Sequence, residues 1–97
     1  MPGEFRAVYV SHRRVFIGSR IRRTRELFAL DCRFMYLHGR RTFTVRIHKD
    51  NPVLKNLQPR NVYTFYPMGG VGFKVVRDVV TDMADGSFYH IGKAVAL

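Results

Sequence analysis

Apolar and polar residues alternate with a period of two through much of the chain, which is the pattern of half-buried β-strands. The clearest case is residues 42–48, where Phe43, Val45 and Ile47 fall on one side. Threonine, arginine and histidine side chains fall on the other side. This segment is therefore predicted to be a strand that turns one face toward a core.

The same pattern, less regular, predicts strands over residues 5–10, 15–22, 26–37, 61–66, 74–81 and 87–91. Residues typical of turns lie between them and indicate a bend at 12–14, a hairpin tip at 38–41 and a glycine-rich loop at 68–73. Residues 53–57 are expected to form one helical turn, which Pro59 closes. Helical structure is thus expected to be a minor part of the fold.

Short strands at this spacing, with barely one helical turn, are typical of a sandwich or a small barrel. The chain has 97 residues and no linker, repeat or low-complexity segment, so we expect a single domain over residues 1–97. The prediction is an all-β fold, a small five- to six-stranded OB-fold-like barrel with protruding hairpins, with an SH3-like barrel as second choice. A helix over residues 20–30 is the competing interpretation of that segment, whose residues have fair helix propensity.

Charge indicates what such a barrel would bind. Seventeen Lys and Arg residues oppose seven Asp and Glu residues, the net charge is +10, and thirteen of the seventeen cations are arginine. Residues 1–49 carry +9 of this net charge and residues 50–97 carry +1. Because a guanidinium holds phosphate with two hydrogen bonds and also stacks on bases, we expect a polyanion-binding surface mostly in the first half.

Six arginines fall within thirteen residues and have no acid among them. They are Arg13, Arg14, Arg20, Arg22, Arg23 and Arg25. A phosphate backbone would relieve their mutual repulsion, and the release of counterions would drive binding. A solvated face and some other anionic partner are the alternatives, and the lack of interleaved Asp or Glu favours nucleic acid.

Aromatic residues are interleaved with these charges. Phe16 shares the arginine-bearing side of its predicted strand, and Phe28, Phe34 and Tyr36 share one side of the next. Rings beside a basic groove are how sequence-tolerant single-strand binders hold bases, although each ring alone could equally belong to the core. The apolar tip of the loop at 68–73 is expected to contact DNA or a second subunit, or to be a plain hairpin loop.

The sequence shows no pattern of an enzyme or of a metalloprotein. The four histidines have no ligand spacing, and the acids are too scattered to form the carboxylate cluster of a metal-dependent nuclease. The one cysteine, Cys32, excludes an internal disulfide and is expected to be buried. We therefore expect no catalytic residue, no metal, no cofactor and no membrane contact, and a cytoplasmic location, which is the host cytoplasm if the protein is viral.

One stretch has a more specific pattern. Residues 34–47 read FMYLHGRRTFTVRI, in which an aromatic strand passes through a short turn into an apolar strand with one basic residue. Residues 57–64 follow with a Pro-x-x-x-Tyr entry to a strand, and then a glycine-rich hairpin ends in Arg77. Over roughly residues 14–80, the order of features resembles the helix-destabilising, single-stranded-DNA-binding proteins of filamentous phages.

The resemblance implies an OB-fold homodimer that coats single-stranded DNA, cooperatively along the strand, during phage-type replication. It implies that Arg20 and Arg22 hold phosphate from a protruding hairpin at residues 18–25 and that Arg46 contacts the backbone from the sheet. It also implies that Phe73 reaches the DNA site of the partner subunit and that Arg77 adds charge beside it. The nucleic-acid-binding residues expected from both lines of argument are Arg14, Phe16, Arg20, Arg22, Arg23, Arg25, Phe28, Phe34, Arg46, Phe73 and Arg77.

A homodimer is also expected on physical grounds, because so short a chain buries only ~60–65% of its unfolded surface. Two other classes of function stay open at this point. One is an RNA-binding OB or SH3-like module, since stacking and phosphate contacts serve RNA as well as DNA. The other is a protein-interaction module for an acidic partner.

Overall fold

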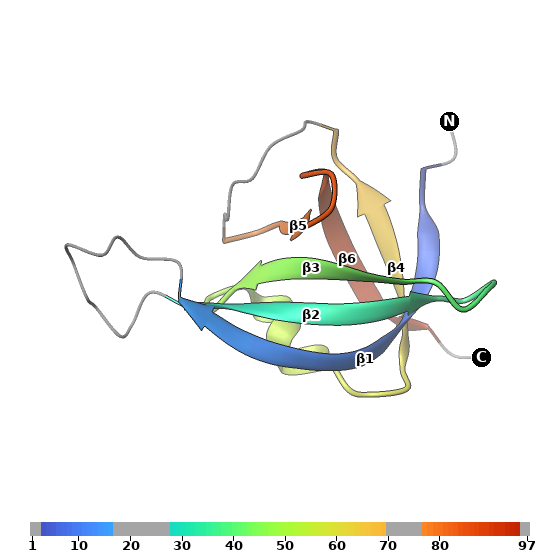
Figure 1. Cartoon of the computed structure of the whole chain (residues 1–97), viewed down its shortest axis with the longest axis horizontal. Coiled ribbons are helices and arrows are strands. Elements are labelled where there is room, and N and C mark those ends of the chain that lie inside the picture. Colours follow the sequence, from blue (N-terminus) through green and yellow to red (C-terminus); the bar gives the residue numbers. More distant parts are fainter. Residues whose placement is uncertain (1–2, 17–27, 70–76, 96–97) are drawn as a thin grey trace.

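Six strands close on themselves into a barrel in the computed structural model, which describes residues 3–16, 28–69 and 77–95 (Figure 1). The strands are β1 (Phe5–Phe16), β2 (Phe28–Tyr36), β3 (Thr42–His48), β4 (Val62–Pro67), β5 (Val80–Asp82) and β6 (Phe88–Val95). Their order around the barrel is β1-β2-β3-β5-β6-β4, and every neighbouring pair is antiparallel. The prediction of an all-β, OB-like barrel is confirmed.

The longest strand, β1, changes neighbours along its length. Residues 5–8 pair with β4 on one side, and residues 7–16 pair with β2 on the other. A shift in register between Tyr9 and Ser11 inserts an extra residue and strengthens the local twist. In Figure 1 the second half of β1 accordingly runs beside β2, while its start curves away toward β4.

The bend predicted at residues 12–14 is wrong, because β1 is continuous from Phe5 to Phe16. Three consecutive polar residues are typical of a turn. This part of β1, however, extends beyond the core, so side chains on both faces of the strand are in contact with solvent and a run of polar residues does not mark the end of the strand. All three of these residues are exposed. The helix considered over residues 20–30 is also wrong at residues 28–30, which belong to β2. The rest of that helix, and the rest of the strand predicted at 15–22, lie outside the described residues.

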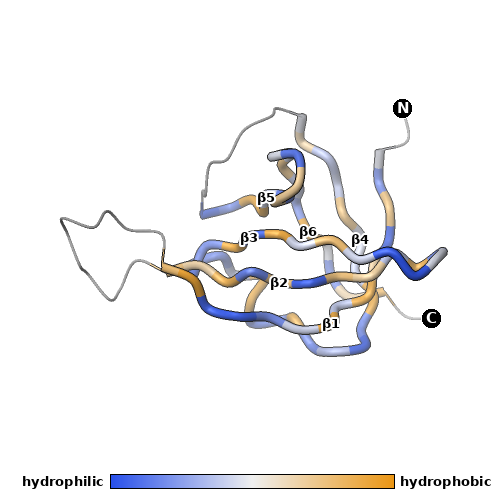
Figure 2. Tube along the Cα trace, viewed as in Figure 1, coloured by the Kyte–Doolittle hydropathy of each residue, from blue (hydrophilic) through white to orange (hydrophobic). Residues whose placement is uncertain are grey.

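The barrel interior is filled by alternate residues of the strands. The buried cluster comprises Ala7, Tyr9, Cys32, Phe34, Phe43, Val45, Ile47, Tyr63, Phe65 and Val80. The alternation predicted for residues 42–48 is borne out along β3, which has those bounds and shows alternating hydropathy in Figure 2. Because buried aromatic rings dominate this cluster, a small domain obtains much of its apolar burial from few residues.

The connection from β3 to β4 contains the predicted helical turn, as a 3₁₀ helix, η1 (Pro52–Asn56). Asn51 caps it, because its side-chain oxygen accepts a hydrogen bond from the Val53 amide at 3.0 Å. The buried hydroxyl of Tyr63 donates to the Asn56 carbonyl and accepts from the Gln58 amide at 2.8 Å. These bonds fasten the connection to β4.

The last two strands differ from their predicted bounds. Within the described residues, β5 covers only Val80–Asp82, and residues 77–78 form a turn where a strand was expected. β6 runs on to Val95, beyond the predicted end at residue 91. Gly92 allows this extension, since a Cβ there would lie 2.8 Å from the Tyr66 ring on neighbouring β4.

Cys32 is buried as predicted, and its thiol and the Tyr9 hydroxyl both resist ionisation. Burial, with the nearby Asp31 charge, raises the pKa of Cys32 from 9.0 to about 12. Burial is also the main cause that raises the pKa of Tyr9 from 10.0 to about 12. The folded protein therefore keeps two protons that the unfolded chain releases at lower pH.

The free energy of unfolding should consequently fall as the pH rises from 9 toward 12, because over that interval the unfolded state binds fewer protons than the folded state. Urea unfolding followed by circular dichroism at several pH values measures this. A Cys32→Ala variant is the matched control, and its decline should begin nearer pH 10, because the tyrosines whose pKa values are raised in the folded protein, Tyr9, Tyr36 and Tyr89, still titrate in its unfolded chain. Equal curves for both proteins would contradict the assignment to Cys32.

Candidate nucleic-acid interface

The side chains that point away from the barrel on β1, β2 and β3 form a surface, here called the outer face. Its members at the centre of the sheet are Ser11, Arg13, Asp31, Arg33, Thr44 and Arg46. The strand register sets Ser11 opposite Arg33 and Arg13 opposite Asp31, and directly opposed residues share one side of a sheet. A shallow groove of about 330 Å³ runs among these side chains and is lined by Arg13, Arg33 and Thr44, among others.

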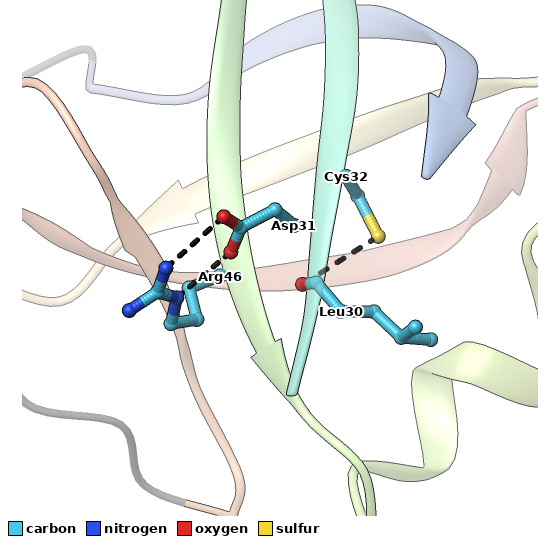
Figure 3. Close-up of polar contacts among 4 residues, drawn as sticks. All are labelled: Leu30, Asp31, Cys32 and Arg46. Carbon is cyan, nitrogen blue, oxygen red and sulfur yellow. Dashed lines mark hydrogen bonds and ion pairs between the residues drawn. The ribbon is translucent and has the colours of Figure 1, made fainter. Parts of the chain in front are cut away.

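Asp31 and Arg46 form a bidentate ion pair on this face (Figure 3). Arg46 Nε donates to Asp31 Oδ1 at 2.7 Å and Nη2 donates to Oδ2 at 3.0 Å. The Asp31 side chain is only 6% exposed, whereas that of Arg46 is 25% exposed. The hydrogen bond from Arg46 to Asp31 raises the pKa of the guanidinium.

This pair bears on the role that the resemblance implies for Arg46. Two of its N–H donors are engaged by Asp31, so a phosphate contact would fall to its remaining donors and stays a prediction. The pair forms because the register sets Asp31 directly opposite Arg46 across β2 and β3. The pair in turn neutralises Asp31, which would otherwise repel phosphate from the groove.

Arg13 and Arg33 keep their charge available. Both are exposed, and within the described part of the chain no carboxylate lies within ion-pair distance of either. Arg33 follows Asp31 by two residues and lies opposite Thr44, so its side chain shares the outer face. The groove is therefore flanked by two cations above a neutralised acid.

The end of the β1–β2 pair carries three of the predicted residues. Phe16 lies opposite Phe28, and Arg14 precedes them by two pairs, on the same side of the ribbon. The Arg14 guanidinium lies 4.4 Å from the centroid of the Phe28 ring, a cation–π contact that covers part of that half-buried ring. Phe16 is 69% exposed, so its ring is open to a stacking partner.

The prediction that Phe34 stacks on bases is wrong. Its side chain is 0% exposed, and its ring packs edge-on against Phe65 with centroids 4.8 Å apart. Alternation places Phe34 on the same side as Cys32, which faces the barrel interior. The spacing of aromatic residues that suggested a base-stacking surface is therefore the spacing of residues that face the core.

The other predicted residues are not part of this surface as described. The Arg77 side chain is 70% exposed and lies 3.9 Å from Asp50, which also neighbours His48 and Lys49. Five predicted residues fall outside the described part of the chain, so their predicted roles stay predictions: Arg20, Arg22, Arg23, Arg25 and Phe73.

Arg33 is the main residue that sequence reasoning missed. A signal for it was present, because a short hairpin at residues 38–41 fixes the pairing of the strands on either side. Counting back from that turn sets Arg33 opposite Thr44 and Asp31 opposite Arg46. No comparable signal relates Arg13 to Asp31, because the β-bulge in β1 shifts that register.

Other chemistry is sparse in the residues described. They contain no group of three or more His, Cys, Asp or Glu side chains that could hold a metal ion. They also include no helix long and apolar enough to span a bilayer. No protein-family model, no curated protein and no solved structure matches the chain.

Proposed function

We propose that this protein binds single-stranded DNA without regard to base sequence, holding phosphates with arginines and stacking bases on an exposed ring. One observation carries the proposal: Arg13 and Arg33 are exposed on the outer face around an acid that Arg46 neutralises, and the same β1–β2 ribbon ends in the open ring of Phe16, on the side of Arg14. The net charge of +10 adds a long-range attraction for any polyphosphate.

The open ring favours a single strand over a duplex. Bases in a duplex are already stacked on one another, whereas an unpaired base gains ~1–3 kcal/mol by stacking on an aromatic side chain. Phe16 is 69% exposed at the end of a two-stranded ribbon, where such a base can reach it.

The wider part of the proposal follows the resemblance to the phage proteins. Two copies of the chain act together, bind cooperatively along the strand and coat replicating DNA in the host cytoplasm. The protein works by binding alone, with no catalytic residue and no cofactor. RNA is the alternative ligand, and the binding experiment below includes it.

Arg13→Ala combined with Arg33→Ala should weaken binding to a dye-labelled dT oligonucleotide and flatten its salt dependence. Each lost phosphate contact removes ~0.7 from the slope of log affinity against log salt concentration, so the double variant should lose ~1.4. Fluorescence anisotropy across a range of salt measures both quantities. The matched control, Lys55→Ala with Lys93→Ala, removes the same charge from residues outside the outer face and should keep the slope.

An unchanged slope in the arginine variant would remove the outer face from the binding site. Matched duplex and rU ligands complete the experiment. Duplex bound as tightly as dT would contradict the single-strand assignment, and tighter binding of rU would move the proposal to RNA.

A further inference from the structure

A second pocket lies at the opposite end of the β1–β2 pair from Phe16. It measures about 600 Å³, and its walls include Glu4, Phe5, Arg6, Tyr36 and Arg41. The register explains why these residues meet, because Ala7 pairs with Tyr36 and the start of β1 therefore lies beside the end of β2. None of these residues lines the groove on the outer face.

One wall of the pocket is aromatic and rigid. The Phe5 ring stacks on the fully buried Phe65 ring, with centroids 5.1 Å apart and planes within 5°. The Tyr36 ring lies 5.3 Å from Phe5, and the Tyr89 ring meets Phe5 edge-on at 5.5 Å. These contacts fix the Phe5 ring, so the pocket presents a flat surface that needs no ordering when a ligand binds.

The rim of the pocket is cationic. Arg6 and Arg41 are both exposed, and no carboxylate of the described residues lies within ion-pair distance of either guanidinium. Burial raises the pKa of the Tyr36 hydroxyl, the charges of Asp82 and Asp85 add to this increase, and the charge of Arg41 acts against it. Two guanidinium groups and one carboxylate, that of Glu4, line the pocket itself, and neither Asp82 nor Asp85 is among its lining residues.

We propose that this pocket binds one nucleoside phosphate, with the base against Phe5 and Tyr36 and the phosphate between Arg6 and Arg41. In a nucleoside phosphate, one sugar separates the flat base from the anionic phosphate. The base matches the flat aromatic wall of the pocket, and the phosphate matches the guanidinium groups at the edge of that wall. Its volume lies within the ~300–1,000 Å³ of small-ligand sites. A nucleotide within a bound strand and a free nucleotide share this chemistry, and the first of these two forms rests on the proposed function.

The test compares two neighbouring arginines of one turn. Arg41 lines the pocket and Arg40 does not, yet both are exposed and follow Gly39 in the β2–β3 turn. Arg41→Ala should weaken dT-oligonucleotide binding about tenfold, the effect of losing one charge-assisted hydrogen bond. Arg40→Ala should weaken it no more than about twofold. Equal losses in the two variants would overturn the pocket.

A direct readout separates the pocket from the outer face. Titration with thymidine monophosphate, and separately with the oligonucleotide, should shift the ring resonances of Tyr36 in NMR spectra. Shifts with either ligand support the pocket, and shifts with the monophosphate in a protein that does not bind the oligonucleotide would keep the pocket while the proposed function fails. Oligonucleotide binding that depends on Arg13 and Arg33, with the Tyr36 ring unmoved by either ligand, would overturn the pocket and keep the proposed function.

Discussion

Replacing Phe34 with alanine should lower the free energy of unfolding by about 3–5 kcal/mol, the cost of a large cavity in a packed core. The Phe34 side chain is 0% exposed, and its ring lies 4.8 Å from Phe65 and 5.4 Å from Tyr9 between ring centroids. Rigid rings cannot collapse into the space. Since small domains are stable by only ~5–15 kcal/mol, urea unfolding should show a much lower midpoint.

Two variants separate this structural role from base stacking. Phe34→Leu keeps most of the volume, so it should cost less stability and leave DNA affinity unchanged. Phe16→Ala should do the opposite, because its ring is 69% exposed: stability should stay within about 0.5 kcal/mol while affinity falls by about five- to tenfold. A folded Phe34→Leu protein that loses affinity would restore a binding role for Phe34.

Arg46→Ala should lower the free energy of unfolding by about 2–3 kcal/mol, because it leaves the Asp31 carboxylate buried without its partner. This expected loss is smaller than the loss on breaking a fully buried ion pair, because the Arg46 side chain is 25% exposed and water screens part of the interaction. DNA affinity should also fall for an electrostatic reason. The released carboxylate lies opposite Arg13 and competes with phosphate for it.

The control for this prediction is Arg33→Ala, which removes a cation of the same face that forms no ion pair with a described acid. Its effect on stability should stay within about 0.5 kcal/mol. Replacing the whole pair, as Asp31→Leu with Arg46→Met, should be nearly neutral, because no buried charge is then left alone. Chemical denaturation of the three variants measures these differences, and equal stabilities for Arg46→Ala and Arg33→Ala would contradict a dependence of Asp31 on Arg46.

The sequence predicted the fold class because alternation and turn chemistry agree over most of the chain. β3 is the best case, since strict alternation and a tight hairpin define both of its ends. β1 is the worst case, because its second half leaves the core and loses the alternation that would identify it as strand. In the described residues this second half pairs with β2 on one side and with no strand on the other. The polarity of a short segment does not indicate whether a strand has one neighbour or two.

The candidate site was predicted less well, for a physical reason. An aromatic residue in a strand is buried or exposed according to its side of the sheet, and that side depends on the register. Phe16 and Phe34 both looked suitable for stacking, yet one is open and the other is fully buried. The engagement of Arg46 by Asp31 likewise depends on pairing between strands, which composition does not show.

The divided pairing of β1 has a mechanical consequence. Ala7 and Val8 are paired on both sides, whereas beyond the Tyr9 bonds to Asn61 and Arg60 the described residues bond the strand to β2 alone. A force on the Arg14–Phe16 end would therefore act on a single row of hydrogen bonds. We expect that end to bend more readily than the part of β1 that belongs to the closed barrel.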